Sequence, residues 1–111
     1  MSHFERLPEF EREFKKLVKK YRSLPNDIKD LEEVLEASPT GMGKNFTIIH
    51  STESVKIVKA RLACESLSDR SVRIIYAYHD YAIEFMYIEI YFKGNKENED
   101  RTRIEEYLKS L

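Results

Sequence analysis

VKIVKARLACESL (residues 55–67), RSVRIIYAYHDY (70–81) and AIEFMYIEIYFKGNKENED (82–100) contain three runs rich in β-branched and aromatic residues. Residues of these types favour strands. Short polar segments at 68–70 and 80–81 join the runs, so the simplest arrangement is an antiparallel meander. A further run, FTIIH, adds a strand before it. The strands expected from this pattern span residues 46–50, 55–64, 71–79 and 82–92.

Basic residues alternate with apolar ones inside these strands. The apolar residues expected on one face of the first long strand are Val58, Ala60, Leu62 and Cys64. Lys59 and Arg61 then point to the opposite face, and Arg73 alternates in the same way on the next strand. We expect these three cations to meet on one face of the sheet. Lys93 joins them or not according to the register across residues 80–81, because a slip of one residue reverses its side.

Two amphipathic helices precede the strands. Apolar residues at helical spacing occur at Phe10, Phe14, Leu17, Val18 and Tyr21, and again at Ile28, Leu31, Val34 and Leu35. Pro8 suits a first helical turn, whereas residues 24–26 interrupt the pattern, so the two segments predict a helical hairpin. Asp100 can cap a final helix, and a brief strand fits residues 3–7.

The predicted fold class is therefore α+β. We expect an N-terminal helical hairpin packed on one face of a mainly antiparallel sheet of three to five strands, with a short C-terminal helix. The other face of the sheet should stay partly open. A chain of 111 residues that is 41% hydrophobic and 35% charged has room for one domain, residues 1–111.

The composition also limits the function. The formal net charge of −1 gives no general attraction for nucleic acid, so such a role must depend on local clusters of cations. A single cysteine, Cys64, excludes an internal disulfide and a thiolate zinc site, and it fits a reducing cytoplasm. The three histidines are far apart in sequence, so no metal site is expected. No apolar run reaches the length of a membrane span.

Three stretches resemble a known family: FEREFKKLVKKYRSLP (10–25), KARLACESLSDRSVRIIYAY (59–78) and IEIYFKGNKENEDRTRI (88–104). Together they resemble a RelE-type toxin of the RelE/ParE superfamily, found in type II toxin–antitoxin systems. The resemblance implies a fold that agrees with the one predicted above. It also implies a ribosome-dependent messenger RNA endonuclease, an mRNA interferase that inhibits translation until an antitoxin neutralises it.

The resemblance assigns catalytic roles to four basic residues. In the implied reaction a ribose 2′-hydroxyl attacks the adjacent phosphate, which requires a base, cations for the phosphate and an acid for the leaving oxygen. Arg73 matches the strand arginine that would hold the phosphate. Lys59 and Arg61 match the paired basic positions of the preceding strand, where neighbouring cations would lower the pKa of Lys59 and let it act as base. Lys93 would assist the leaving group.

Lys56, Tyr91 and Lys96 are the further candidates for RNA binding, and Lys96 is an alternative to Lys93. Several family members use a tyrosine or histidine near the C-terminal end, and residues 95–101 contain neither. Tyr91 shares strand parity with Lys93 and could stack on a base in its place. Glu89 is expected near Arg73, as an ion-pair partner rather than as a base.

Two alternatives remain open at this stage. One is a ParE-like toxin that inhibits a DNA topoisomerase, and the other is a non-catalytic binding protein on the same fold. The favoured interpretation implies a cognate antitoxin, the ribosome and messenger RNA as partners. It requires no metal, no small-molecule cofactor and no membrane, and it places the protein in the cytoplasm.

Overall fold

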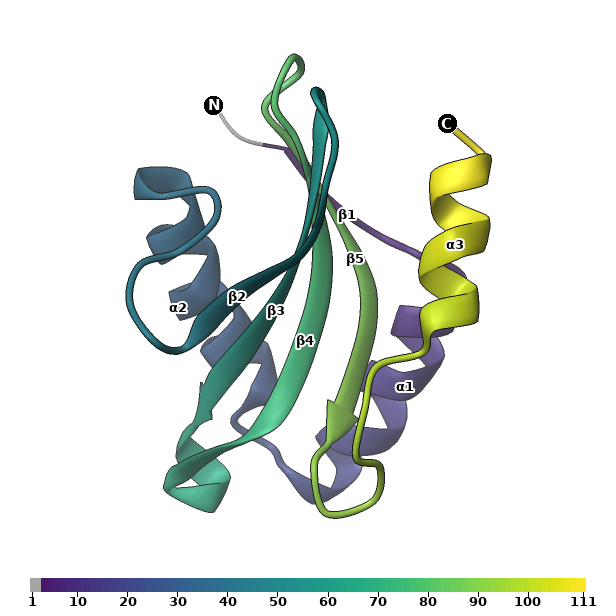
Figure 1. Cartoon of the computed structure of the whole chain (residues 1–111). Helices are drawn as coiled ribbons and strands as arrows, with labels where there is room; N and C mark the ends of the chain where they lie inside the picture. The colour runs from purple at the N-terminus through teal and green to yellow at the C-terminus, as the bar shows by residue number, and fades with distance from the viewer. Residues whose placement is uncertain (1–2) are drawn as a thin grey trace.

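The protein has a five-stranded sheet flanked by helices, as a computed structural model that describes residues 3–111 shows (Figure 1). The elements, in chain order, are β1 (His3–Arg6), α1 (Pro8–Lys20), α2 (Leu24–Ala37), β2 (Phe46–Ser51), β3 (Val55–Cys64), a 3-10 turn (Glu65–Leu67), β4 (Asp69–His79), β5 (Glu84–Phe92) and α3 (Arg101–Lys109). The α+β class and the brief first strand are both confirmed.

The strand order across the sheet is β1-β5-β4-β3-β2. Strands β2 to β5 form the expected antiparallel meander, while β1 adds to β5 in parallel and places His3 opposite Glu84. Strand β3 has the predicted bounds, 55–64. Strand β4 begins two residues before the expected Ser71, and β5 begins two residues after the expected Ala82.

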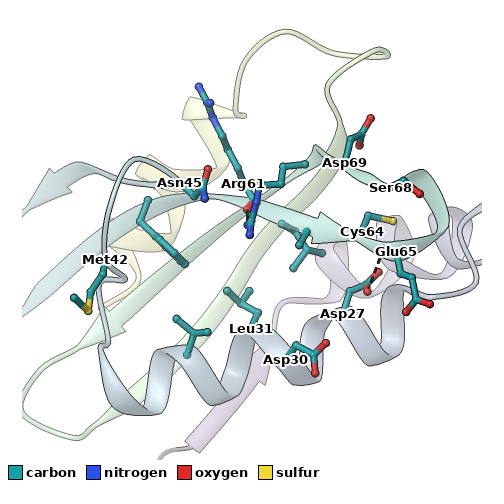
Figure 2. Close-up of a pocket in the computed structure, with 15 residues that line it drawn as sticks. Asp27, Asp30, Leu31, Met42, Asn45, Arg61, Cys64, Glu65, Ser68 and Asp69 are labelled. Atoms are coloured by element: carbon teal, nitrogen blue, oxygen red, sulfur yellow. Dashed lines mark hydrogen bonds between the residues drawn. The ribbon is translucent and has the colours of Figure 1, made fainter.

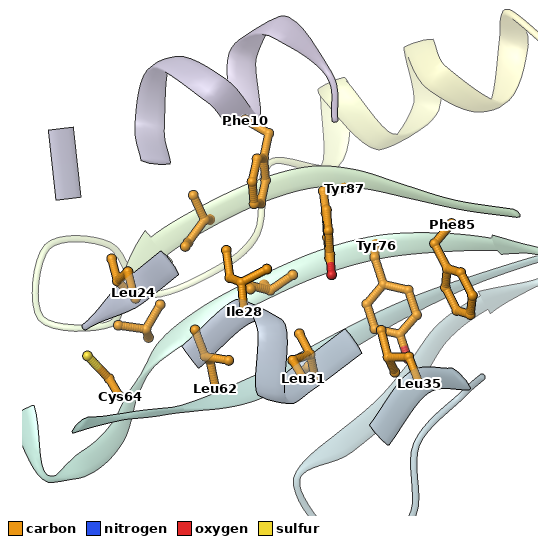
Figure 3. Packing of buried hydrophobic residues seen from close by; sticks show 14 of the residues in the cluster. Phe10, Leu24, Ile28, Leu31, Leu35, Leu62, Cys64, Tyr76, Phe85 and Tyr87 are labelled. Carbon is orange, nitrogen blue, oxygen red and sulfur yellow. The ribbon is translucent and has the colours of Figure 1, made fainter. Parts of the chain in front are cut away.

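Helices α1 and α2 cover one face of the sheet and bury the larger of two cores (Figure 3). Phe10 of α1 stacks on Tyr87 of β5 with ring centroids 5.1 Å apart, and Ile28 and Leu35 of α2 are fully buried. Full burial of each such side chain contributes roughly 1.5–3 kcal/mol. The predicted packing of the hairpin on one face is confirmed.

Helix α3 lies on the opposite face, so that face is less open than the sequence suggested. Ile104 and Tyr107 of α3 pack with Ile57, Ile75 and other residues of the sheet in a second core. The sequence pattern of α3 thus predicted this helix correctly without revealing on which face of the sheet it packs. The part of the second face that α3 leaves uncovered lies over the ends of β3 and β4 nearest their connection, next to the loop that enters α3.

A bulge in β5 decides which side chains reach this second face. Ile75 pairs with Glu89 and the next residue, Tyr76, pairs with Tyr87, so Ile88 is an extra residue in the ladder. Tyr87 therefore faces α1, while Ile88 belongs to the second core. Because an extra residue reverses the alternation that follows it, Glu89 and the residues two and four positions later share the second face.

The helix boundaries follow their capping residues. Helix α2 begins at Leu24, four residues before the expected Ile28, because Pro25 is tolerated in a first turn, where its missing N–H costs nothing. Helix α3 begins after Asp100, whose carboxylate accepts a hydrogen bond from the Arg103 amide at 3.0 Å, as the predicted N-cap should. Leu111 lies beyond the end of this helix and is 63% exposed.

Candidate functional site: a basic groove with one buried carboxylate

A groove of about 680 Å³ lies on the second face of the sheet, between β2, β3, β4 and the loop that joins β5 to α3. Its lining is dominated by basic and amide side chains with two carboxylates. The residues that line it are Asn45, Thr47, Ile49, Lys59, Arg61, Arg73, Lys93, Glu97, Asn98, Glu99 and Arg101. We call this feature the basic groove.

The four residues expected to be catalytic all line the basic groove. Arg61 on β3 pairs directly with Arg73 on β4, and Lys59 precedes Arg61 by two residues on the same face. The alternation of apolar and basic residues therefore predicted this side of the sheet correctly. Lys93 joins them because the bulge at Ile88 gives it the parity of Glu89, and its amide donates to the Ser71 carbonyl at 2.8 Å.

Arg73 is positioned deep in the groove by backbone and neighbouring charge. Its guanidinium donates a hydrogen bond to the Arg70 carbonyl, and only 8% of the residue is exposed. Burial, followed by the positive charge of Arg61, lowers the pKa of Arg73 from its ordinary value. Arginine pKa values are so high that the group stays charged. Two arginines thus occupy directly opposite positions on neighbouring strands, and like charges in such positions destabilise a sheet.

Lys59 has an acidic partner that the sequence analysis missed. Its ammonium donates to the Glu99 carboxylate at 3.0 Å, and Glu99 lies in turn 3.6 Å from the Arg101 guanidinium. Burial is the largest single influence and acts to lower the pKa of Lys59, but the hydrogen bond to Glu99 and the charge interactions with Tyr91 and Glu99 together outweigh it, so the pKa is raised. The expectation that crowding by cations lowers this pKa is wrong, because the Glu99 carboxylate lies within hydrogen-bond distance of the Lys59 ammonium and raises the pKa.

Glu99 is ionised in this environment. Only 6% of its side chain is exposed, and burial alone would raise its pKa. A backbone hydrogen bond and the Lys59 ammonium act in the other direction and lower the pKa below its usual value. Strand or helix periodicity could not predict the place of Glu99 or Arg101 in the groove. Glu99 lies at the end of a loop, and Arg101 is the first residue of α3. The available signal was the acidic segment ENED (97–100) directly after the last basic strand end.

The other three RNA-binding candidates do not line the basic groove. Lys56 has the parity of Val58, so it lies on the face that α1 and α2 cover. Lys96 pairs with the Glu89 carboxylate and its ammonium lies 5.4 Å from the centre of the Tyr91 ring. Tyr91 pairs with Arg73 across the strands as its parity requires, yet it is 6% exposed and belongs to the second core. In this structure it offers no open face to a base.

Glu89 has a structural partner other than the one expected. The residue is fully buried, and Lys96 is its ion-pair partner where Arg73 was expected. Its second oxygen accepts a hydrogen bond from the Asp100 amide at 2.8 Å. Glu89 thus attaches the loop to the sheet at both of these residues. Among the described residues it is the one carboxylate with no exposed surface.

A second cavity, of about 640 Å³, lies between α2 and β3 (Figure 2). Its apolar part includes Leu31, and carboxylates from Asp27, Asp30, Glu65 and Asp69 line it together with Arg61 and Arg70. Two of the hydrogen bonds there fix its wall, since the Asp27 carboxylate accepts from the Ser23 hydroxyl at 2.7 Å and from the Glu65 amide at 3.4 Å. Acidic groups outnumber basic ones, so the cavity is ill suited to phosphate.

Histidine and cysteine side chains in the described part of the chain form no metal centre. Residues 3–111 hold no group of three or more potential His, Cys, Asp or Glu ligands close together. His79 is buried and its Nε2 atom contacts the Tyr107 hydroxyl, which fixes α3 on the sheet. Within the same described range, no helix is long and apolar enough to cross a membrane.

Comparisons with known proteins address the fold. No protein-family model matches the sequence, and no curated protein matches it significantly. A chain in the crystal structure of an archaeal RelE–RelB complex from Pyrococcus horikoshii OT3 superposes with a TM-score of 0.64 and is 15% identical in sequence. The match covers 84% of this chain and 96% of that chain. The predicted resemblance is therefore confirmed at the level of structure, and the protein has the RelE-type fold.

Proposed function

We propose that this protein is the toxin of a type II toxin–antitoxin module and that it cleaves messenger RNA on the ribosome. The observation that carries the proposal is the basic groove, where Arg61 and Arg73 lie directly opposite each other on neighbouring strands. Like charges in that position cost stability unless an anion binds between or beside them. A phosphodiester is an anion that two guanidinium groups bind well, through paired hydrogen bonds.

The proposed reaction joins the ribose 2′-oxygen to the adjacent phosphorus and releases the 5′-oxygen of the next nucleotide. Arg73 and Arg61 hold the phosphate and offset the charge that develops on it. Lys59, kept protonated by Glu99, adds a third positive charge. Lys93, at the end of β5, donates a proton to the leaving oxygen. No step requires a metal ion.

The proposed partners follow from the same interpretation. The similar chain of known structure comes from a RelE–RelB complex, and we propose that this protein likewise binds a cognate antitoxin. The antitoxin would carry an acidic or amphipathic segment that wraps the helical hairpin or covers the basic groove. The ribosome would hold the messenger RNA against the groove in the cytoplasm. A net charge of −1 supports this dependence, because the protein as a whole does not attract nucleic acid.

The proposal predicts that Arg73→Ala abolishes toxicity. The wild type and the variant are induced in a bacterial host, growth is followed, and messenger RNA ends are mapped by primer extension. We expect growth arrest with new ends inside translated reading frames for the wild type and neither effect for the variant. Arg73→Lys should retain only part of the activity, because an ammonium cannot make the paired contacts of a guanidinium.

Arg12→Ala is the matched control, since Arg12 is an exposed arginine of α1, away from the basic groove. Circular dichroism of each purified variant checks that the fold is retained. Growth arrest with intact messenger RNA would contradict the nuclease proposal. It would favour a ParE-like toxin that acts on a protein target. Normal growth with folded wild-type protein would contradict the toxin proposal and favour a binding protein on this fold.

A further inference from the structure

A carboxylate occupies the basic groove beside the groups that would bind phosphate. The Glu99 side chain lies within hydrogen-bond distance of the Lys59 ammonium, 3.0 Å away, and close to Arg101. It lines the same groove as Arg73 and Lys93. A carboxylate at this place reduces the attraction of the groove for anions. Its presence therefore calls for an explanation other than phosphate binding.

The position of Glu99 is fixed by the fold on both sides. The next residue, Asp100, donates its amide to the buried carboxylate of Glu89 at 2.8 Å and caps α3 through its own side chain. Earlier in the loop, Lys96 forms an ion pair with the other Glu89 oxygen. The loop is thus tied to β5 at two points and to α3 at its end. Glu99 is held in the groove in a defined place, which a group that acts in chemistry requires.

The cleavage reaction needs a proton acceptor, and few groups in the groove can serve. Ammonium and guanidinium groups carry no free lone pair, and Glu99 keeps Lys59 in its protonated form. The other carboxylate that lines the groove, Glu97, is exposed and has no ion-pair partner among the described residues. The Tyr91 hydroxyl is buried, and burial raises the pKa of that group further from the physiological range.

We propose that Glu99 is the general base of the cleavage reaction, an inference that rests on the function proposed above. In the proposed step the Glu99 carboxylate takes the proton of the ribose 2′-hydroxyl as the 2′-oxygen forms its bond to phosphorus. The bond between phosphorus and the 5′-oxygen breaks, and that oxygen takes a proton from the Lys93 ammonium. The products are a 2′,3′-cyclic phosphate and a 5′-hydroxyl, and one proton returns from Glu99 to Lys93 through solvent.

Lys59 has two tasks in this arrangement. In the free protein its ammonium holds the Glu99 carboxylate in place at 3.0 Å. When a phosphate enters the groove, the same ammonium has a second anion to bind, so its hold on Glu99 weakens. The negative charge that grows on the phosphate then makes protonation of Glu99 more favourable. The carboxylate becomes a better base at the stage of the reaction that needs one.

Single-turnover cleavage separates chemistry from binding in the test. Purified ribosomes programmed with a defined message are mixed with excess wild type, Glu99→Gln, Glu99→Asp or Glu97→Gln, and both the binding and the rate of cleavage are measured. Glu99→Gln keeps the shape and can still accept a hydrogen bond from Lys59, but it cannot take a proton. We expect its cleavage rate to fall by roughly 10²–10⁴-fold while binding is unchanged or tighter.

Glu97→Gln is the matched control, because it removes the same charge from the same groove without touching Lys59. Its cleavage rate should fall far less than that of Glu99→Gln, and the rate of Glu99→Asp should lie between those of the wild type and Glu99→Gln. Faster cleavage by Glu99→Gln would overturn the proposal and make Glu99 a competitor of phosphate. Equal losses of cleavage rate in Glu97→Gln and Glu99→Gln would overturn the proposal, because the effect would then come from removing any negative charge from the groove.

The same experiment gives a different result if the protein is not a ribosome-dependent nuclease. If the wild type binds programmed ribosomes and leaves the message intact, the nuclease proposal falls and the assignment of a base falls with it. If the wild type cleaves and Glu99→Gln cleaves as well, only the assignment of Glu99 is overturned. The folded state of each variant is checked by circular dichroism, so loss of structure cannot be taken for loss of the base.

Discussion

Charges within the basic groove are arranged in two unlike ways. Arg61 and Arg73 face each other without an acidic partner between them in the described chain, whereas Lys59 has Glu99 at 3.0 Å. The first pair destabilises the sheet and the second offsets burial of both its members. The groove thus combines a part in which two positive charges lack an ion-pair partner with a part in which the charges compensate each other. Stability and pH dependence at the site are governed by the second part.

Replacement of Lys59 by methionine should destabilise the protein in a pH-dependent way. The pKa of Glu99 is lowered from its usual 4.5 in the folded state, so its contribution to stability is fully present above pH 4.5 and is lost as the pH falls through the folded-state value. Removal of Lys59 leaves a carboxylate with little exposure, at a cost of about 1–3 kcal/mol at neutral pH. Urea unfolding at neutral pH and at about pH 3 should show this loss shrinking in acid.

Lys56→Met is the matched control for this prediction. Lys56 lies on the same strand with its side chain on the opposite face, and no ion pair of Lys56 occurs within residues 3–111. Its removal should change the free energy of unfolding little at either pH. A Lys59→Met loss of the same size at both pH values would show that packing of the lysine stem, rather than its charge, stabilises the groove.

Strand alternation predicted single residues well and loop contacts poorly. Lys59, Arg61 and Arg73 reach one face because every second residue of a strand does, which is visible in the sequence. Tyr91 was placed on the correct face, but its burial depends on a loop that folds back over it. The Lys59–Glu99 contact spans 40 residues and follows no period, so only its acidic and basic composition was visible beforehand.

The loop between β5 and α3 is the element that completes the groove. It contributes Glu97, Asn98 and Glu99 to the lining and is attached to the sheet through Glu89. Its C-terminal end is the start of α3, so the capping of that helix and the placement of Glu99 depend on adjacent residues. A change that frays the first turn of α3 should therefore affect the groove as well.

Removal of the helix cap should lower the stability of α3. In Asp100→Ala the Arg103 amide loses the acceptor now 3.0 Å away, which costs about 1 kcal/mol. For a domain of this size the melting temperature should fall by roughly 4–8 °C. Asp100→Ser is the control, because a serine hydroxyl also caps helices. If the melting temperature of the serine variant falls as far as that of the alanine variant, the Asp100 carboxylate acts through the Arg103 guanidinium at 3.8 Å and not as a helix cap.

Helix α2 illustrates what a sequence pattern leaves out at this scale. Pro25 was interpreted as a break, yet it occupies the first turn, where its fixed backbone angle favours a helix.

The bulge at Ile88 is a second example. Simple alternation puts Glu84 and Glu89 on opposite faces, but the extra residue brings both to the face of α3. Neither glycine nor proline marks the bulge, so the sequence contains no local signal for it.

At the scale of the whole molecule, helices on both faces divide the buried residues between two cores. The larger core lies under α1 and α2, and the smaller one under α3 includes Val55, Ile57, Ile75 and Ile88. The predicted fold class was correct because periodicity reveals how many helices and strands exist. It does not reveal which face a terminal helix takes, since that choice depends on packing between residues far apart in sequence.

Truncation after residue 99 should unfold the smaller core. Loss of α3 removes Ile104 and Tyr107 from the sheet and exposes the apolar residues beneath them. The shortened chain is expected to bind a hydrophobic dye and to lose its cooperative thermal transition. Removal of Leu111 alone is the control, since that residue is largely exposed and lies beyond α3. A cooperative transition in the shortened chain would contradict the prediction and show that the rest of the chain folds cooperatively without α3.

The parallel pairing of β1 with β5 joins two segments that are far apart in sequence, with His3 opposite Glu84. During synthesis, β1 leaves the ribosome before its partner strand and stays unpaired until β5 has followed. Lys59 likewise waits for Glu99. The β1 edge of the sheet and the groove therefore form only after β5 and the loop beyond it have been translated. A chain whose proposed target is translation thus cannot complete its groove before its own residues 84–99 have been translated.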